Sequence, residues 1–286
     1  HLGRVGGQHR GDVHGREGPG QLLVGLALGL QQLDGVDQGA GTLVARLGVG
    51  AFHIADFDTF DIANFNRQAG AMMSTLGQPK VAVLAQMATD INPELEIKQF
   101  PDGIHDSNLA EFFAGVDLYV DGLDFFAFPA RQATFATCAR LGIPAITAAP
   151  LGMGTAVLSF MPGGMTFEEY FGWGDLPEEE KALRFLVGLA PAGLHGPYLV
   201  DPSAINLKER RGPSTIMGCQ LCAGAAATEA LKILLKRGKV MAAPHGMHFD
   251  AYRNKLVHTW RPGGNRHPLQ RLAMALIKRR RAAQGA

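Results

Sequence analysis

Short apolar runs alternate with helix-like patterns between residues 44 and 148, and this alternation limits the folds open to the chain. The segments at residues 52–55, 94–99, 117–121 and 144–148 are predicted strands. The intervening segments 79–91, 108–114 and 129–141 are predicted helices, with apolar residues at helical spacing in the first of them. Strands separated by helices pair in parallel and are covered on both faces. We therefore expect an α/β fold with a doubly wound, mainly parallel, Rossmann-like sheet.

The second half of the chain follows a different pattern. It predicts a strand at residues 156–160, helices at 177–189 and 218–235, and a C-terminal antiparallel hairpin at 247–260. Residues 191–213 show little periodicity and are interpreted as an ordered crossover segment. The chain is divided into an atypical segment 1–43, a main domain 44–267 and a basic amphipathic tail 268–286. That tail could contact an anionic membrane or RNA, although a solvated C-terminal helix is the favoured interpretation.

Composition excludes several classes of protein. The chain has 286 residues with 47% hydrophobic content, which is enough for a buried core. A net charge of +1 argues against DNA binding by the chain as a whole. Cys138, Cys219 and Cys222 are too few for a disulfide framework and fit a reducing cytoplasm. The apolar run at residues 21–30 is too short to span a bilayer and lacks a convincing cleavage site, so we predict neither a transmembrane segment nor a signal peptide.

Polar residues with the chemistry of a nucleotide site follow the apolar run at 52–55. Asp56 and Asp58 end this run, and an acid at the end of a buried parallel strand is suited to a ribose hydroxyl. Asn64 and Arg67 are three residues apart, so a helical turn would place them on one face. Arg67 and Lys80 are cations that could bind a polyphosphate, the arginine in a bidentate manner. The segment therefore predicts a nucleoside triphosphate site without a Walker lysine loop.

These motifs occur in a specific order. The chain contains D-x-D at Asp56–Asp58, N-x-x-R-Q at Asn64–Gln68 and G-x-x-K at Gly77–Lys80. Further matching pieces are Ile91-Asn92-Pro93, the run from Asp117 to Asp124, Gly142-Ile143-Pro144 and the helix segment Ala227–Lys232. Over residues 45–235 the chain resembles the ThiF/MoeB/HesA adenylyltransferases, which are relatives of ubiquitin-like modifier activating enzymes.

The resemblance implies a role for each residue in an ATP- and Mg²⁺-dependent adenylyltransferase. Asp56 would hold the ribose, whereas a helix-capping acid is the alternative. Asp58 would support the same loop. Asn64 and Arg67 would contact the phosphates, and Lys80 would reach the phosphates around the reacting bond, although a surface lysine is the alternative.

A further acid is implied to bind the metal. Asp124 follows a predicted strand at the carboxyl edge of the sheet, and the resemblance makes it the Mg²⁺ ligand. Asp121 would share that role or cap the loop. Relatives usually have Asn directly after this acid, whereas Phe125 stands here, and this departure weakens the case for the metal contact.

The start of the chain also departs from the family pattern. Relatives have a buried strand followed by a G-x-G-G-x-G turn, whereas this chain has only Gly39-Ala40-Gly41-Thr42. A degenerate nucleotide loop is one interpretation, and a non-native, frame-shifted start is the favoured one. On that basis residues 1–41 are expected to lack the central strand and to pack poorly.

The cysteines and two histidines are interpreted as structural. Many relatives bind zinc through two C-x-x-C pairs, and three cysteines cannot build such a site. Cys219 and Cys222 are therefore assigned to core packing, and a covalent thioester is not expected. His245 and His248 are interpreted as a surface pair beside the hairpin.

The resemblance leaves three functions open. The first is activation of the C-terminal carboxylate of a small ubiquitin-like or sulfur-carrier protein ending in Gly-Gly. The second is a cyclising dehydratase acting on carboxylate-modified tRNA, which the near-neutral charge makes less favoured. The third is a catalytically impaired binding module that lacks the glycine loop. Relatives usually form homodimers, so a homodimer is expected.

Overall fold

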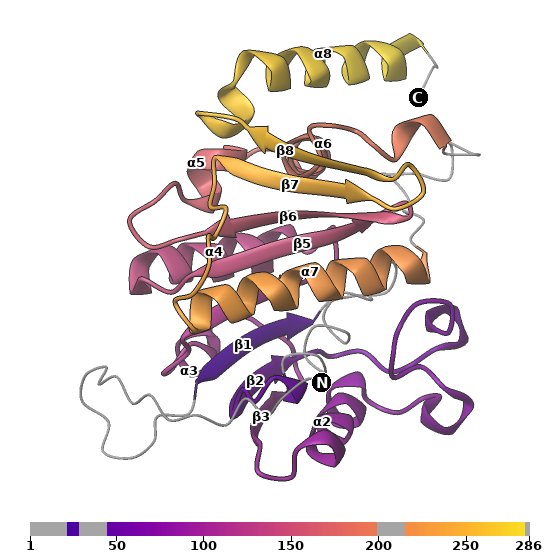
Figure 1. The fold of residues 1–286 in the computed structure, drawn as a ribbon, viewed down its shortest axis with the longest axis vertical. Helices are drawn as coiled ribbons and strands as arrows, with labels where there is room; N and C mark the ends of the chain where they lie inside the picture. The colour runs from indigo at the N-terminus through magenta and orange to yellow at the C-terminus, as the bar shows by residue number, and fades with distance from the viewer. Residues whose placement is uncertain (1–21, 29–44, 199–214, 284–286) are drawn as a thin grey trace.

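The computed structural model describes residues 22–28, 45–198 and 215–283 (Figure 1). One eight-stranded sheet has the strand order β3-β2-β1-β4-β5-β6-β7-β8. Its strands are β1 (Leu23–Leu28), β2 (Ala51–Ala55), β3 (Glu96–Phe100), β4 (Leu118–Gly122), β5 (Ala145–Leu151), β6 (Gly154–Phe160), β7 (His245–Asp250) and β8 (Lys255–Trp260). The strands from β3 to β5 are parallel, whereas β6, β7 and β8 run antiparallel to their neighbours. The predicted doubly wound, mainly parallel sheet with a C-terminal hairpin is confirmed.

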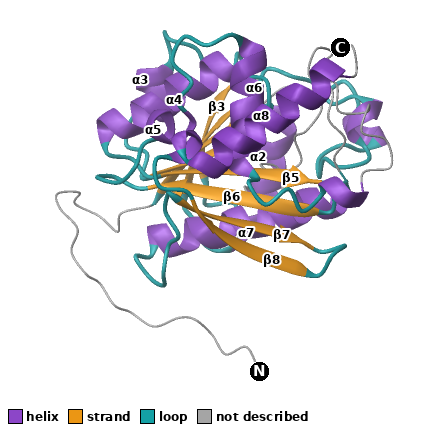
Figure 2. Ribbon diagram, turned by 90° about the horizontal axis from the view of Figure 1, so that it is seen from above, coloured by secondary structure: helices purple, strands orange, loops and turns teal. Residues whose placement is uncertain are grey.

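Helices cover both faces of this sheet (Figures 1 and 2). They are α2 (Lys80–Ile91), α3 (Leu109–Phe112), α4 (Phe128–Leu141), α5 (Phe167–Phe171), α6 (Glu178–Leu189), α7 (Ile216–Leu234) and α8 (Pro268–Ala283). All but α5 were expected within a few residues of their observed bounds. Short 3-10 turns occur at η1 (Ile62–Asn64), η2 (Met73–Thr75), η3 (Gly196–Tyr198) and η5 (Gly264–Arg266). Within the described ranges, every helix is too short or too polar to cross a bilayer.

The central strand corrects our expectation for the amino-terminal segment. β1 lies between β2 and β4 and pairs in parallel with both, so the strand that the sequence analysis found missing is present at Leu23–Leu28. Val24 is fully buried, and Gly25 lets the ring of Phe112 approach, because a Cβ there would lie 3.2 Å from it. The expectation of a poorly packed segment was therefore wrong for these residues. Gly39 and Gly41, and the rest of residues 1–21 and 29–44, lie outside the described part of the chain.

Small residues on α7 bring this helix close to one face of the sheet. α7 packs against β5 and β6, where Cys222, Ala223 and Ala226 are fully buried. The same cluster includes apolar residues of β1, β2 and β4 and two side chains from α2. β2 and β4 are buried along their whole length, and all of their residues except His53 and Asp121 are apolar or glycine, as is typical of parallel strands with two covered faces.

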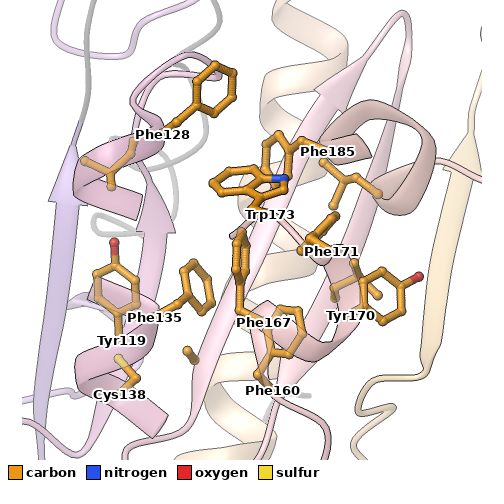
Figure 3. Packing of buried hydrophobic residues seen from close by; sticks show 14 of the residues in the cluster. Tyr119, Phe128, Phe135, Cys138, Phe160, Phe167, Tyr170, Phe171, Trp173 and Phe185 are labelled. Carbon is orange, nitrogen blue, oxygen red and sulfur yellow. The ribbon is translucent and has the colours of Figure 1, made fainter. Parts of the chain in front are cut away.

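Aromatic residues fill the opposite face (Figure 3). Phe135 on α4 stacks on Phe167 of α5 with ring centroids 4.3 Å apart. Trp173 is fully buried and lies edge-on to Phe128 and Phe167. Each buried aromatic ring removes a large apolar area from water, so this cluster is a major stabilising contact between the parallel half and α5–α6.

The tail helix packs on the domain instead of standing apart from it. Met274 of α8 is buried against Leu183 and Val187 of α6. Lys278 forms an ion pair with Glu180 at 2.6 Å. One side of α8 is thus committed to α6, while Leu269, Leu272 and Leu276 remain about half exposed.

The two histidines on β7 do not form a surface pair, and that interpretation was wrong. His248 is 1% exposed and lies 5.9 Å from the ring of His195, whereas His245 is exposed and stacks on Trp260. Successive strand residues point to opposite faces, so residues three apart cannot share one. Asp250, fully buried on the same face as His248, accepts a hydrogen bond from the hydroxyl of Tyr198 at 2.6 Å.

Burial of His248 should make the protein less stable in mild acid. Desolvation, with the neighbouring His195, lowers the pKa of His248 to about 4. Between pH 6.5 and pH 4, His248 is protonated in the unfolded chain and neutral in the folded chain. The free energy of unfolding should therefore fall as the pH drops through this range. We expect a loss on the order of 1–2 kcal/mol between pH 7 and pH 5 from this group.

Urea denaturation at several pH values would measure this slope. His248→Leu should flatten it, because the substitution removes the titrating ring without removing a strong hydrogen bond. The control His245→Leu alters an exposed ring on the same strand and should keep the wild-type slope. A His248→Leu variant with an unchanged slope would contradict the assignment.

Candidate active site at the carboxyl edge of the sheet

The carboxyl ends of three adjacent strands lie in one row. Ala27 of β1 pairs with Ala55 of β2 on one side and with Asp121 of β4 on the other. Asp56 therefore follows β2, and Asp124 follows β4, at the same edge of the sheet. From β1 the chain adds β2 and β3 on one side of the sheet and then β4 and β5 on the other, so the strand order reverses between β1 and β4. Ligands of open α/β sheets bind outside the carboxyl ends of the strands at such a point. The structure meets our expectation that Asp56 and Asp124 share one edge.

Asp56, Asp58 and Lys80 form one linked unit. The N–H of Asp58 donates to Oδ1 of Asp56 at 2.9 Å. Nζ of Lys80 lies 3.2 Å from Oδ2 of Asp58, and the lysine is 1% exposed. The backbone N–H of Lys80, the first residue of α2, donates to the carbonyl of Asp58 at 2.9 Å. Lys80 is thus a buried ammonium at the edge of the sheet, and not the surface lysine that was the alternative.

The Asp56 carboxyl group is held in an unfavourable environment. Burial raises the pKa of Asp56 to about 6, although Lys80 and the N–H of Asp58 favour its charged form. A carboxyl group whose pKa is raised by burial beside a specific cation is a typical feature of functional sites.

Asn64 and Arg67 lie on the segment between Asp58 and Lys80. The side chain of Asp61 caps the η1 turn, and Oδ1 of Asn64 accepts a hydrogen bond from the N–H of Asp61 at 2.9 Å. Nη1 of Arg67 donates to the carbonyl of Ala63 at 2.7 Å and to Oδ1 of Asn66 at 3.0 Å. Both Asn64 and Arg67 are buried. Phe60 and Gln78 tie the two ends of the segment together through a backbone hydrogen bond of 2.9 Å, so the segment is a closed loop beside the edge.

The acid near the end of β4, Asp121, and the acid after it, Asp124, have different surroundings. Asp121 is fully engaged within the fold: Oδ2 accepts from Nε of Arg131 at 2.8 Å and from Thr147 at 2.7 Å, and Oδ1 accepts from the N–H of Leu123. Asp121 therefore caps the loop, as one of the two interpretations held. Oδ1 of Asp124 accepts from the N–H of Phe126 at 2.8 Å, and Asp124 is 8% exposed at the edge.

The sequence analysis did not select Arg131. Its guanidinium is buried, and although burial opposes its charge, Asp121 raises the pKa of Arg131. An arginine on the apolar face of a predicted helix, ten residues after an acid, was the available signal. Phe125, which departs from the family pattern, packs against Phe185 with ring centroids 5.2 Å apart.

The acids at this edge are compatible with Mg²⁺, provided that a ligand supplies oxygen atoms. Within the described ranges, no group of three or more His, Cys, Asp or Glu side chains could enclose a metal. Mg²⁺ usually binds through one or two carboxylates together with substrate phosphates, so the single carboxylate of Asp124 fits that mode. Cys219 and Cys222 are buried in α7, as the packing interpretation requires, and Cys138 is buried in α4.

A family model described as "ThiF family" matches residues 38–272. The chain belongs to the ThiF family. It is 33% identical over 134 residues to a tRNA threonylcarbamoyladenosine dehydratase from Bacillus subtilis, covering 46% of this chain and 52% of that protein. It is 28% identical over 178 residues to the sulfur carrier protein ThiS adenylyltransferase of Escherichia coli, covering 62% and 65%.

Other relatives of this ThiF-family chain span more of its length. The SAMP-activating enzyme E1 of Haloferax volcanii is 26% identical over 230 residues, covering 80% of this chain and 74% of that one. Among solved structures, E. coli MccB with ATP matches with a TM-score of 0.60 at 16% identity, covering 83% of this chain and 63% of that one. This last likeness concerns the fold alone. The matched region spans only about half of the Bacillus relative.

We expect Asp56 to reduce the stability of the ligand-free protein. Its folded pKa of about 6 lies above the ordinary value of 3.8, so the folded state disfavours the carboxylate. The penalty is absent below pH 3.8, grows through pH 6 and is complete above it. Asp56→Asn should therefore raise the free energy of unfolding at pH 8 by roughly 1–3 kcal/mol, and by much less near pH 4.

Denaturant melts at pH 8 and pH 4 would test this expectation. Asp90→Asn, an exposed acid on α2, is the matched control and should change stability by less than about 0.5 kcal/mol at either pH. If Asp56→Asn were destabilising at pH 8, Asp56 would be a structural acid and not a ligand-binding one.

Proposed function

We propose that the chain is an ATP-dependent adenylyltransferase that activates the C-terminal carboxylate of a small carrier protein. The observation that carries the proposal is the buried Asp56–Asp58–Lys80 unit at the same carboxyl edge as Asp124. A buried cation and a carboxyl group of raised pKa beside a topological switch point suit a nucleotide. Relatives named as adenylyltransferases of sulfur-carrier and molybdopterin-synthase systems support this choice.

In this proposal each residue positions ATP for attack at the α-phosphorus. Asp56 accepts hydrogen bonds from the ribose, and Asn64 and Arg67 bind phosphate oxygens. Lys80 offsets the charge that develops between the α-phosphate and the departing pyrophosphate. A carboxylate oxygen of the carrier forms a bond to the α-phosphorus as the bond to the β-phosphate oxygen breaks, which yields a carrier adenylate and pyrophosphate. Positioning and charge stabilisation account for most of the rate in such a reaction.

Mg²⁺ would bind at Asp124 and would neutralise phosphate charge when bound. The contribution of the protein to this step is to fix the position of the Asp124 carboxylate at the edge of the sheet. Arg131 and the N–H of Phe126 fix the loop that carries it.

A second function acts through the same site on a different substrate. The relatives include tRNA threonylcarbamoyladenosine dehydratases from Bacillus subtilis, E. coli and Haemophilus influenzae, at 33%, 29% and 30% identity. Arg279 and Arg280, exposed near the end of α8, would contact RNA phosphates in that case. Activation of a carboxylate by ATP serves either substrate, so the nucleotide-binding residues have the same roles in both. A non-catalytic binding module is the third possibility, and it would bind ATP without exchanging pyrophosphate.

We also propose a homodimer. Exposed apolar side chains gather on the loop between Asp58 and Lys80, where Ile62 is 66% and Met73 is 75% exposed. Phe65 and Met72 lie on the same loop. Light scattering of the purified chain would test this proposal, and a monomer at micromolar concentration would contradict it.

ATP–pyrophosphate exchange tests the proposed activity. We expect ATP to bind in the mid-micromolar range, roughly −5 to −7 kcal/mol. Arg67→Ala and Lys80→Ala should each slow adenylate formation by about 100-fold or more, because each removes a cation from the phosphates. Lys98→Ala, at an exposed lysine of β3, is the control and should retain full exchange.

The choice of added substrate separates the three functions. Exchange stimulated by a Gly-Gly-ended carrier supports the first, and AMP release dependent on carboxylate-modified tRNA supports the second. ATP binding without exchange or AMP release in either case would favour the binding module. Unchanged exchange in both variants would reject the assigned site.

A further inference from the structure

A buried arginine underlies the loop that presents Asp124. Arg131, on the first turns of α4, lies below the loop that leaves β4, and its side chain is 3% exposed. The loop is short and connects the last residue of β4 to α4, so its backbone determines where the carboxylate of Asp124 points.

The guanidinium donates hydrogen bonds to Asp121 near the end of β4 and to the backbone of this loop. Nε donates to Oδ2 of Asp121 at 2.8 Å. Nη1 donates to the carbonyls of Asp124 at 3.0 Å and Phe125 at 3.2 Å, and Nη2 donates to the carbonyl of Leu123. Three successive carbonyls of the loop therefore bind one planar group.

The other side of the guanidinium is also fixed. Its central carbon lies 4.6 Å from the centroid of the Phe185 ring on α6, which is buried in the aromatic cluster (Figure 3). This cation–π contact restricts the guanidinium, and the plane of the guanidinium in turn sets the directions of its N–H groups. Asp124 is further held by the N–H of Phe126 on its Oδ1 atom.

Neither charge balance nor packing alone requires this geometry. The ion pair with Asp121 would need one N–H, and a lysine could supply it. Only a rigid fork can bind Asp121 and the carbonyls of Leu123, Asp124 and Phe125 together. Through these hydrogen bonds, Arg131 on α4 holds the loop backbone and so fixes the position of the Asp124 carboxylate.

We propose that Arg131 is a positioning residue that sets the Mg²⁺-dependent part of nucleotide binding by fixing Asp124. This inference rests on the proposed function, because it assigns Asp124 to the metal. Arg131 touches neither nucleotide nor metal in this proposal and acts only through the loop. Its loss should therefore affect ATP binding with Mg²⁺ and spare ATP binding without it, which depends on Asp56, Arg67 and Lys80.

Calorimetric titration of the full chain with ATP, in Mg²⁺ and in EDTA, tests the inference. For Arg131→Lys we expect at least tenfold weaker binding in Mg²⁺ and less than a twofold change in EDTA. The control is Arg184→Lys: Arg184 also donates to a backbone carbonyl, that of Gly172, and pairs with Glu180, but lies on α6 away from the loop. It should match the wild type under both conditions.

A double-mutant cycle with Asp124→Asn separates positioning from general support of the fold. If Arg131 acts through Asp124, Arg131→Lys should weaken binding in Mg²⁺ less than twofold further in the Asp124→Asn background. If Arg131→Lys melts early, the pair Asp121→Asn with Arg131→Gln removes both buried charges together and should show the same selective loss in Mg²⁺.

Several outcomes would overturn the inference. Equal weakening in EDTA and in Mg²⁺ would show a general structural role, and multiplicative effects in the cycle would show that Arg131 does not act through Asp124. If the wild type exchanges pyrophosphate and Arg131→Lys binds ATP in Mg²⁺ as tightly as the wild type, the role of Arg131 is rejected and the proposed function stands. A wild-type protein that neither binds ATP nor exchanges pyrophosphate would reject the proposed function, and this inference with it.

Discussion

The parallel pairing of β1 with β2 and β4 is the constraint on which the rest of the structure depends. It aligns Ala55, Ala27 and Asp121 in one row, so the segments after β2 and β4 leave the sheet at the same edge. Neighbouring strands lie about 4.8 Å apart, so the backbones after β2 and β4 start roughly 10 Å from each other. Without β1 between them, both strands would expose unpaired backbone groups, and the two acids would have no fixed separation.

Buried charges at this edge fall into two kinds. Arg131 and Asp121 satisfy each other and the surrounding backbone, so their burial is compensated within the fold. Asp56 is not compensated to the same degree, as the pKa of about 6 shows. Fully satisfied buried groups hold a structure in place, whereas a group kept in an unfavourable state is typical of a position that serves a ligand. This contrast separates the supporting part of the site from the part proposed to bind the nucleotide.

Most strands and helices could be predicted because their patterns are local. The strand at 52–55 and the helix at 79–91 needed only an apolar run and a helical period, and the structure has them at Ala51–Ala55 and Lys80–Ile91. β1 was missed because Leu23–Leu28 has one β-branched residue and a glycine, so its composition does not favour a strand. The backbone groups of β2 and β4 need hydrogen-bond partners, and pairing with both strands outweighs the weak strand propensity of Leu23–Leu28.

The sequence by itself determined the fold class, which follows from periodicity along the chain, and the order of the polar motifs, on which the resemblance to the ThiF family rests. The tertiary structure alone decided which acid is engaged within the fold, because the side-chain partners of Asp121 come from α4 and β5, whereas Asp124 accepts from the N–H of Phe126 in its own loop. It also decided that His248 is buried beside His195, a contact between residues 53 positions apart. Such long-range partners set desolvation and hydrogen bonding, and those determine the charge state of each group.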